Sequence, residues 1–414
     1  MNDIYDVIVI GGGPSGMMAA GIAASRGAQV LLLEKNSTLG KKLLLSGNGR
    51  CNITHAEFDL RALVSAYGDT GAFLFSALHA FGPKQTMAFF EDIGVPLHTE
   101  PTGRVFPVSN SAGKVVDALT ENLENNFVTI SCSCEVKKVL VHDSLVTSVI
   151  LKNNNEIKTK NLIIATGGLS YPATGSTGDG INWAKKIGLD IVSPNPALVP
   201  LKTRESWVKH IQGLALDNVE VTVFQRNKKI TSNIGDLLFT HFGVSGPVIL
   251  NVSKDVIEAK KHGDVTLKIN MIADSTIEEF DKKLQSEFKE HSKTYLKNYL
   301  TYYVPKRMGD CLLKISKMNG DKVLADITRE ERAKLCGMLC GLELTVAGDM
   351  GYHLAMVTSG GVSVKEIDPK TMRSKKISNL FVVGEALDID GPTGGYNLQA
   401  AWATGYVAGS HIEV

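Results

Sequence analysis

The sequence lacks long apolar runs, and no stretch approaches the roughly 18 apolar residues that a membrane-spanning helix needs. It also lacks an excess of charge, because 44 basic and 43 acidic side chains leave a formal net charge of +1. The near-neutral net charge does not indicate nucleic-acid binding, and the sequence has no evident basic patch interleaved with aromatic residues. These absences predict no membrane partner and no nucleic-acid partner, and they favour a small-molecule substrate.

The six cysteines lack the spacing of a zinc site and that of a CxxC redox pair. We therefore expect isolated thiols and no metal. Asp3 and Asp6 stand where a signal peptide would carry positive charge, which predicts a cytoplasmic protein. With 414 residues, 43 % of them hydrophobic, and 40 glycines, the chain has the size of two or three domains and the composition of an α/β enzyme.

The most informative motif occupies residues 5–34, where a strand-like run, a glycine cluster, a helix of small residues and a second apolar run follow one another. This is the length of one parallel strand–helix–strand unit. Gly11 would make the tight turn, Gly13 would let the backbone approach a pyrophosphate, and Gly16 would let the helix pack closely on the sheet. The motif therefore predicts a dinucleotide site rather than a purely structural turn.

Neighbouring residues complete this predicted site. Pro14 and Ser15 begin the helix, whose N-terminus offers free N–H groups and a positive dipole end to phosphate. Glu34 ends the second apolar run at about the distance from the last glycine where an acid accepts the hydroxyls of an adenosine ribose. Lys35 follows it and joins the candidate cofactor contacts.

A second group of candidates lies in the electropositive loop at residues 41–54. Its glycines permit close backbone approach, and Arg50 offers a planar cation. We predict that the loop wraps the cofactor with backbone N–H groups, the alternative being a solvated turn. Cys51 has no apparent resolving partner, which favours a structural thiol. The candidates in this loop are Lys42, Ser46, Gly47, Gly49, Arg50, Cys51 and Asn52.

Two later segments also have the character of cofactor contacts. A buried strand ends in small residues at 166–168, and near the C-terminus a strand is followed by acids, which can accept ribityl hydroxyls. A glycine pair then begins another helix of small residues, and its N–H groups and dipole can stabilise negative charge on a reduced ring. The candidates are Thr166, Gly167, Gly168, Gly384, Glu385, Asp388, Gly394, Gly395, Tyr396, Asn397 and Leu398.

No second glycine fingerprint occurs in the required context. The stretch at 172–180 resembles a phosphate loop, but it does not open a new strand–helix–strand unit. A nicotinamide nucleotide would therefore visit the protein as a transient substrate rather than occupy a domain of its own.

The middle of the chain predicts further domains. Residues 129–150 alternate apolar and polar side chains, as an antiparallel meander does, and short alternating strands after Pro194 indicate a small β domain. Ser275 with Glu278, and Thr328 with Glu331, form two capping boxes that indicate a helical insertion at about 273–337.

Several stretches together resemble the three-domain bacterial flavoproteins that include BaiN-like and aminoacetone-oxidase-like proteins. They are GGGPSGMMAA, GKK…SGNGRCNIT, ATGG, PATGSTGDG, PALVPL, GDLLFTHFGVSGP and GEALDIDGPTGGYNLQAAWATG, and they span essentially the full chain. The resemblance implies an α/β fold of the two-dinucleotide-binding flavoprotein type. Its Rossmann-like FAD-binding domain (1–192 and 353–414) is interrupted by a β-barrel-like substrate domain (193–272 and 338–352), which carries a helical domain (273–337).

The resemblance also specifies FAD as the dinucleotide. It implies that Glu34 holds the adenosine ribose, that Gly11 to Gly16 hold the pyrophosphate, and that Val136 lies near the adenine. The segments 50–52, 166–168 and 394–398 would lie along the flavin. Members of the family differ in activity, so the resemblance implies no substrate.

We hypothesise an FAD-dependent oxidoreductase that moves hydride to or from flavin N5 on a small organic substrate, either as an NAD(P)H-linked reductase or as an amine oxidase. His241, among glycines at a strand end, and Tyr396 are candidate acid–base residues, although a structural role for His241 is the alternative. A second hypothesis is a flavin-binding partner or redox-sensing protein with structural FAD. A third, an RNA-modifying flavoenzyme, is disfavoured by the near-neutral charge. The oligomeric state is left open.

Overall fold

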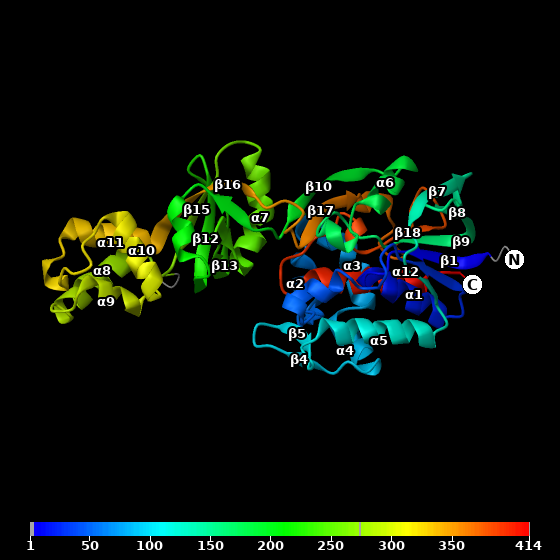
Figure 1. Ribbon diagram of the computed structural model, residues 1–414, viewed down its shortest axis with the longest axis horizontal. Helices are drawn as coiled ribbons and strands as arrows, with labels where there is room; N and C mark the ends of the chain where they lie inside the picture. The colour runs from blue at the N-terminus through cyan, green and yellow to red at the C-terminus, as the bar shows by residue number, and fades with distance from the viewer. Residues whose placement is uncertain (1–3, 273–274, 414) are drawn as a thin grey trace. The chain divides into compact units, whose positions relative to one another are not determined.

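The computed structural model describes residues 4–272 and 275–413 (Figure 1). Contacts divide the chain into two compact units, the first made of Met1–Pro196 with Ala355–Val414 and the second of Ala197–Leu354. The boundaries therefore lie at 196/197 and 354/355, a few residues beyond the expected positions of 192/193 and 352/353. The first unit therefore combines the two ends of the chain.

Unit 1 is built on a parallel sheet. Strand β1 (Tyr5–Ile10) pairs in parallel with β2 (Val30–Leu33) on one side and with β9 (Glu156–Ile164) on the other. Strand β6 (Thr129–Ser131) extends the sheet beyond β2, and β18 (Leu380–Val382) pairs with the end of β9. Their apolar residues are almost wholly buried, as in parallel sheets whose two faces are both covered.

An antiparallel meander joins this sheet through β7 (Val136–His142), β8 (Leu145–Leu151) and the first residues of β9. The predicted meander is correct here but wrong for Thr129–Ser131, which pairs in parallel with β2. Three alternating residues are too few to distinguish a meander strand from an edge strand of a parallel sheet.

The first and last helices of unit 1 pack together through glycines. A Cβ on Gly405 of α12 (Tyr396–Ser410) would lie 2.4 Å from the carbonyl oxygen of Ser15 in α1 (Pro14–Ser25). A Cβ on Gly409 would lie 2.5 Å from the carbonyl oxygen of Ala19. Small residues at these positions therefore allow the close approach that brings the C-terminal helix beside the glycine motif.

The rest of unit 1 comprises short helices and two small sheets. The three-stranded sheet formed by β3, β5 and β4 was not predicted from the sequence. The elements are β3 (Thr54–His55), α2 (Leu60–Ser65), α3 (Gly71–Ala80), α4 (Pro83–Asp92), β4 (Leu97–Thr99), β5 (Arg104–Pro107), α5 (Ala112–Asn125), α6 (Asp179–Lys186), β10 (Ile191–Ala197) and β17 (Val357–Val362).

Unit 2 contains a closed six-stranded barrel, which confirms the predicted β-barrel-like domain. Residues 219, 221 and 223 of β12 are buried and alternate with less buried neighbours, as one wall of a barrel requires. The barrel order is β11 (Leu201–Thr203), β14 (Gly243–Ser245), β13 (Lys228–Phe239), β12 (Ala215–Gln225), β15 (Thr266–Asn270) and β16 (Leu342–Asp349), with α7 (Pro247–Lys260) following β14.

The described residues between β15 and β16 form four α-helices. They are α8 (Ile277–Glu290), α9 (Leu296–Tyr299), α10 (Lys306–Ser316) and α11 (Arg329–Gly341), and their buried side chains belong to the same apolar cluster as those of the barrel. The capping box of Thr328 with Glu331 is confirmed. The box predicted for Ser275 is wrong by one residue, because the next pair, Thr276 and Glu279, has the same spacing and chemistry and forms it instead. No helix in the described part of the chain is long and apolar enough to cross a membrane.

Candidate functional site

The turn between β1 and α1 has two kinds of glycine. A Cβ on Gly11, whose φ is +108°, would lie 2.4 Å from the carbonyl oxygen of Ala165, and a Cβ on Gly16 would lie 1.9 Å from the carbonyl oxygen of Gly11. Gly13 is different, because nothing lies within 4 Å of the position of its Cβ. It is also the N-cap of α1 and contributes no side-chain cap. Gly11 and Gly16 thus serve packing, while Gly13 leaves the helix N-terminus open to a phosphate group.

Glu34 is buried beside this turn. Its Oε2 accepts a hydrogen bond of 2.8 Å from the amide of Gly12, and its Oε1 accepts one of 2.8 Å from the amide of Asn36. The side-chain amide of Asn36 also donates to the carbonyl oxygen of Thr174 at 2.9 Å. The carboxylate is therefore fixed where β2 ends and is connected to the loop at 172–180.

A narrow cleft opens between the ends of β1 and β2 and this loop. Val136, predicted near the adenine, lines it, whereas Cys134, Glu135 and Trp183 were not predicted. Lys35 Nζ donates to Asp179 Oδ2 at 2.6 Å and so ties the loop to β2. The lining residues are Ile10, Gly11, Leu33, Glu34, Lys35, Cys134, Glu135, Val136, Thr166, Gly175, Asp179 and Trp183. The loop that resembles a phosphate loop is thus one wall of the cleft.

Two buried polar atoms in this region lack a hydrogen-bond partner in the described structure, Asn52 Oδ1 and Thr166 Oγ1. Buried polar groups nearly always have partners, so both atoms are available to bond a ligand. Both belong to residues predicted to contact the cofactor. Together with the open space at Gly13, they are compatible with a bound dinucleotide such as FAD.

The loop after β2 is shaped by left-handed residues. Gly47, Asn48 and Gly49 have φ between +56° and +83°, and a Cβ on Gly47 would lie 2.9 Å from the amide nitrogen of Asn52. The Ser46 carbonyl oxygen accepts a hydrogen bond of 3.0 Å from the amide of Cys51. Burial raises the pKa of the Cys51 thiol to about 12. A neutral, buried thiol agrees with the structural interpretation of this cysteine.

Arg50 in the same loop is held by two partners. Its guanidinium carbon lies 3.9 Å from the centroid of the Phe106 ring, and its Nη1 donates to Glu100 Oε1 at 2.9 Å. Arg104 also pairs with Glu100, at 3.1 Å. These contacts fix a planar cation at the end of the glycine-containing loop.

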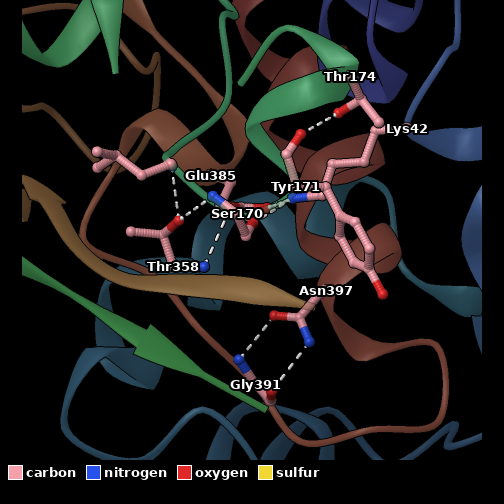
Figure 2. Close-up of polar contacts among 9 residues, drawn as sticks. Lys42, Ser170, Tyr171, Thr174, Thr358, Glu385, Gly391 and Asn397 are labelled. Atoms are coloured by element: carbon pink, nitrogen blue, oxygen red, sulfur yellow. Dashed lines mark hydrogen bonds and ion pairs between the residues drawn. The ribbon is translucent and has the colours of Figure 1, made fainter. Parts of the chain in front are cut away.

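Figure 2 shows Glu385 at the centre of a polar network. Its Oε2 lies 2.8 Å from Lys42 Nζ, and its Oε1 accepts from Ser170 Oγ at 2.6 Å and from the amide of Thr358 at 3.0 Å. Thr358 Oγ1 in turn accepts from the amides of Leu169 and Ser170. The network joins four segments around Gly168. Sequence reasoning identified Lys42 and Glu385 but missed Ser170, which follows the ATGG stretch, and Thr358, which no motif marks.

The segment around Glu385 contacts α1 and strand β17 of the two-stranded sheet. A Cβ on Gly384 would lie 2.4 Å from Ser15 Oγ, and the amide of Asp388 donates to the carbonyl oxygen of Val362. The side chain of Asn397 bonds the backbone of Gly391 at both its nitrogen and its oxygen, which closes the turn before α12 (Figure 2). Leu398 lies half-buried in the first turn of α12.

The glycine pair before α12 lies beside two stacked aromatic rings, those of His55 and Tyr396. Gly394 and Gly395 have φ of +115° and +106°, and a Cβ on Gly395 would lie 2.4 Å from the backbone of Thr54. The Tyr396 ring stacks on His55 with the ring centroids 4.8 Å apart, and His55 Nδ1 lies 3.1 Å from the carbonyl oxygen of Gly394. Sequence reasoning missed His55, although it directly follows the GRCNIT stretch.

The Tyr396 side chain is half-buried. Burial and, to a smaller extent, the carboxylate of Glu57 raise its pKa above the ordinary value. The hydroxyl of Tyr67 donates to the backbone oxygen of Tyr396 at 2.8 Å and fixes its backbone. His241 belongs to the second unit, where its exposed ring packs edge-on against Phe242.

A parallel sheet with a glycine turn at a helix N-terminus and an acid after the second strand defines a dinucleotide-binding, Rossmann-type fold. The chain belongs to the family described as HI0933-like protein Rossmann domain, whose profile matches residues 5–411. This assignment confirms the predicted BaiN-like family and the predicted fold class. The family is one of FAD-dependent oxidoreductases, and FAD is the cofactor that it implies.

The chain is also similar to two curated proteins over nearly its full length and to one solved structure in its fold. It is 30% identical to a ribosomal RNA dihydrouridine synthase of Escherichia coli (strain K12), over 99% of this chain and 98% of that protein. It is also 30% identical to a 3-dehydro-bile acid delta(4,6)-reductase of Clostridium scindens, over 97% of each chain. Its fold is similar to that of a 3-ketosteroid-delta4-(5alpha)-dehydrogenase from Rhodococcus jostii RHA1, with a TM-score of 0.54 at 14% identity over 99% of this chain and 98% of that one.

Proposed function

We propose that the protein is an FAD-dependent reductase that adds hydrogen across a carbon–carbon double bond conjugated to a carbonyl group, with NAD(P)H as the transient reductant. The observation that carries this proposal is the similarity, over nearly the full length of the chain, to a ribosomal RNA dihydrouridine synthase and to a 3-dehydro-bile acid delta(4,6)-reductase. Dihydrouridine is uridine with one conjugated ring double bond reduced, and an unsaturated 3-dehydro bile acid is a conjugated enone. The shared chemistry supports the reaction type and leaves both RNA and small enones as substrate classes.

When bound, FAD supplies hydride transfer through its N5 position. The chain would hold its dinucleotide end with the turn Gly11 to Gly16 and with Glu34. Loop residues 50–52 and the strand end at 166–168 would lie along the flavin. The N-terminus of α12, after Gly395, would direct amide groups and its dipole toward negative charge on the ring.

The residue proposed to handle the proton is Tyr396. Reduction of a conjugated double bond needs one proton at carbon, and an acid that remains protonated at neutral pH can provide it. A tyrosine is protonated at neutral pH because its ordinary pKa is about 10, and the stacked ring of His55 limits the movement of the Tyr396 side chain. His241 is the second candidate for this role, supported by its place among glycines at a strand end.

Anaerobic stopped-flow absorbance tests the reductant. FAD-loaded protein mixed with NADH, and separately with NADPH, is expected to lose its flavin band with at least one of them, and an enone or a uridine-containing RNA should restore the band. Free FAD with the same reductants is the control. Loss of the band with amines alone would make the protein an oxidase, and no loss with any donor would favour structural FAD.

A further inference from the structure

The end of the loop at 41–54 is fixed to α12 by two buried side chains of that helix. The backbone oxygen of Ile53 accepts a hydrogen bond of 2.9 Å from Trp402 Nε1. The hydroxyl of the next residue, Thr54, donates to Gln399 Oε1 at 2.6 Å. Trp402 and Gln399 are both fully buried. These two bonds anchor the chain to α12 immediately before His55.

Gln399 is the centre of a buried hydrogen-bond network. Its Oε1 accepts from Thr54 and also from Thr86 Oγ1 in α4, at 3.0 Å, and its Nε2 donates to the carbonyl oxygen of Phe81 at 2.8 Å. Both threonines are fully buried as well. A buried polar network whose groups are all bonded holds its members in one arrangement. Gln399 therefore fixes α12 to the loop end, to α4 and to the end of α3.

The Thr54 end of this network lies among the candidate cofactor contacts. A Cβ on Gly395 would lie 2.4 Å from the carbonyl carbon of Thr54, so the loop end touches the start of α12 directly. Asn52, whose buried Oδ1 has no hydrogen-bond partner in the described structure, lies two residues before Thr54. His55, whose ring stacks on Tyr396, is the next residue. The Thr86 end leads to α4 instead, which contains no candidate contact.

We propose that Gln399 is a positioning residue, which holds the loop end against the N-terminus of α12 through Thr54 and thereby helps to set the reduction potential of the flavin. The inference rests on the proposed function, in which this helix N-terminus faces negative charge on the reduced ring. Stabilisation of that charge depends on the distance and direction of the N–H groups. A displaced helix start therefore weakens the binding of reduced FAD more than that of oxidised FAD.

The two threonines distinguish this role from a purely structural one. Both donate to the same oxygen of Gln399, and only Thr54 belongs to the loop end. Removal of either hydroxyl leaves that oxygen with one donor, so neither change creates an unsatisfied acceptor. Gln399→Leu would break all three bonds of the network at once and is expected to unfold the protein.

The test compares Thr54→Val with Thr86→Val in FAD-loaded full-length protein, by anaerobic redox titration of the flavin against a dye of known potential. Thr54→Val is expected to bind reduced FAD about fivefold more weakly relative to oxidised FAD, which lowers the potential of a two-electron couple by about 20 mV. Thr86→Val should keep the wild-type potential. Both should lower Tm to a similar extent, because each loses one buried hydrogen bond. Thr54→Ser retains the hydroxyl and should keep the wild-type potential.

Three results would overturn the proposal: a wild-type potential in Thr54→Val, an equal shift in both valine variants, or an equal shift in Thr54→Ser and Thr54→Val. Reduction of the wild-type flavin by NAD(P)H is measured in the same preparation. Normal reduction with any of these three results refutes the positioning role alone. The expected set of potentials in a protein that neither NADH nor NADPH reduces refutes the proposed reductant and leaves the positioning role standing.

Discussion

Replacement of Gly13 by valine is expected to yield a folded protein that is purified without bound flavin. The Cβ position of Gly13 is open, and its φ of −83° with ψ of −175° is an extended conformation that valine adopts readily. The new side chain would occupy the space where the backbone approaches the pyrophosphate. We expect FAD to bind at least about 100-fold more weakly, or roughly 2.8 kcal/mol. Isothermal titration of the apoprotein with FAD measures this loss.

Gly348→Val is the matched control for this variant. Gly348 lies in the barrel strand β16, also has nothing within 4 Å of its Cβ position, and has no positive φ. It should bind FAD as the wild type does. Gly16→Val should instead fail to fold, since its Cβ would lie 1.9 Å from the carbonyl oxygen of Gly11. Wild-type FAD affinity in Gly13→Val would place the pyrophosphate elsewhere.

Tyr396→Phe is expected to slow substrate reduction by about 10²- to 10⁴-fold, the usual contribution of a positioned acid. Phenylalanine keeps the ring that stacks on His55 and removes only the hydroxyl, which is the proposed proton donor. Reduction of the bound flavin by NAD(P)H should remain normal, because that half of the reaction does not need this proton. Stopped-flow measurement of the two half-reactions separates the effects.

Tyr406→Phe provides the comparison, since it makes the same change in the same helix at a ring that stacks on Phe81. It should leave both half-reactions unchanged. If Tyr396→Phe reoxidises at the wild-type rate, the proton comes from another group. His241→Gln would then be expected to show the loss.

The parts of the site that could be predicted are those specified by local spacing. Gly11, Gly13, Gly16 and Glu34 lie within one strand–helix–strand unit, and the structure places Glu34 beside the glycine turn. Ser170 and Thr358 could not be predicted, because their contact with Glu385 joins residues far apart in the sequence. A local sequence pattern contains no information about contacts between residues so far apart in the chain.

The errors have related causes. The first capping box was misplaced because Ser275 and Thr276 are chemically equivalent caps, and each has a glutamate three residues later. Thr129–Ser131 was assigned to the antiparallel meander because three alternating residues do not distinguish a meander strand from an edge strand of a parallel sheet.

The most direct test of the central claim is product analysis after anaerobic incubation of FAD-loaded protein with NAD(P)H and a conjugated acceptor. The acceptors are a fragment of ribosomal RNA and, in parallel, a steroid dienone. We expect at least one acceptor to gain two hydrogen atoms by mass spectrometry, in amounts that match the NAD(P)H consumed. Complete reduction of the flavin without any gain of hydrogen by either acceptor would contradict the account.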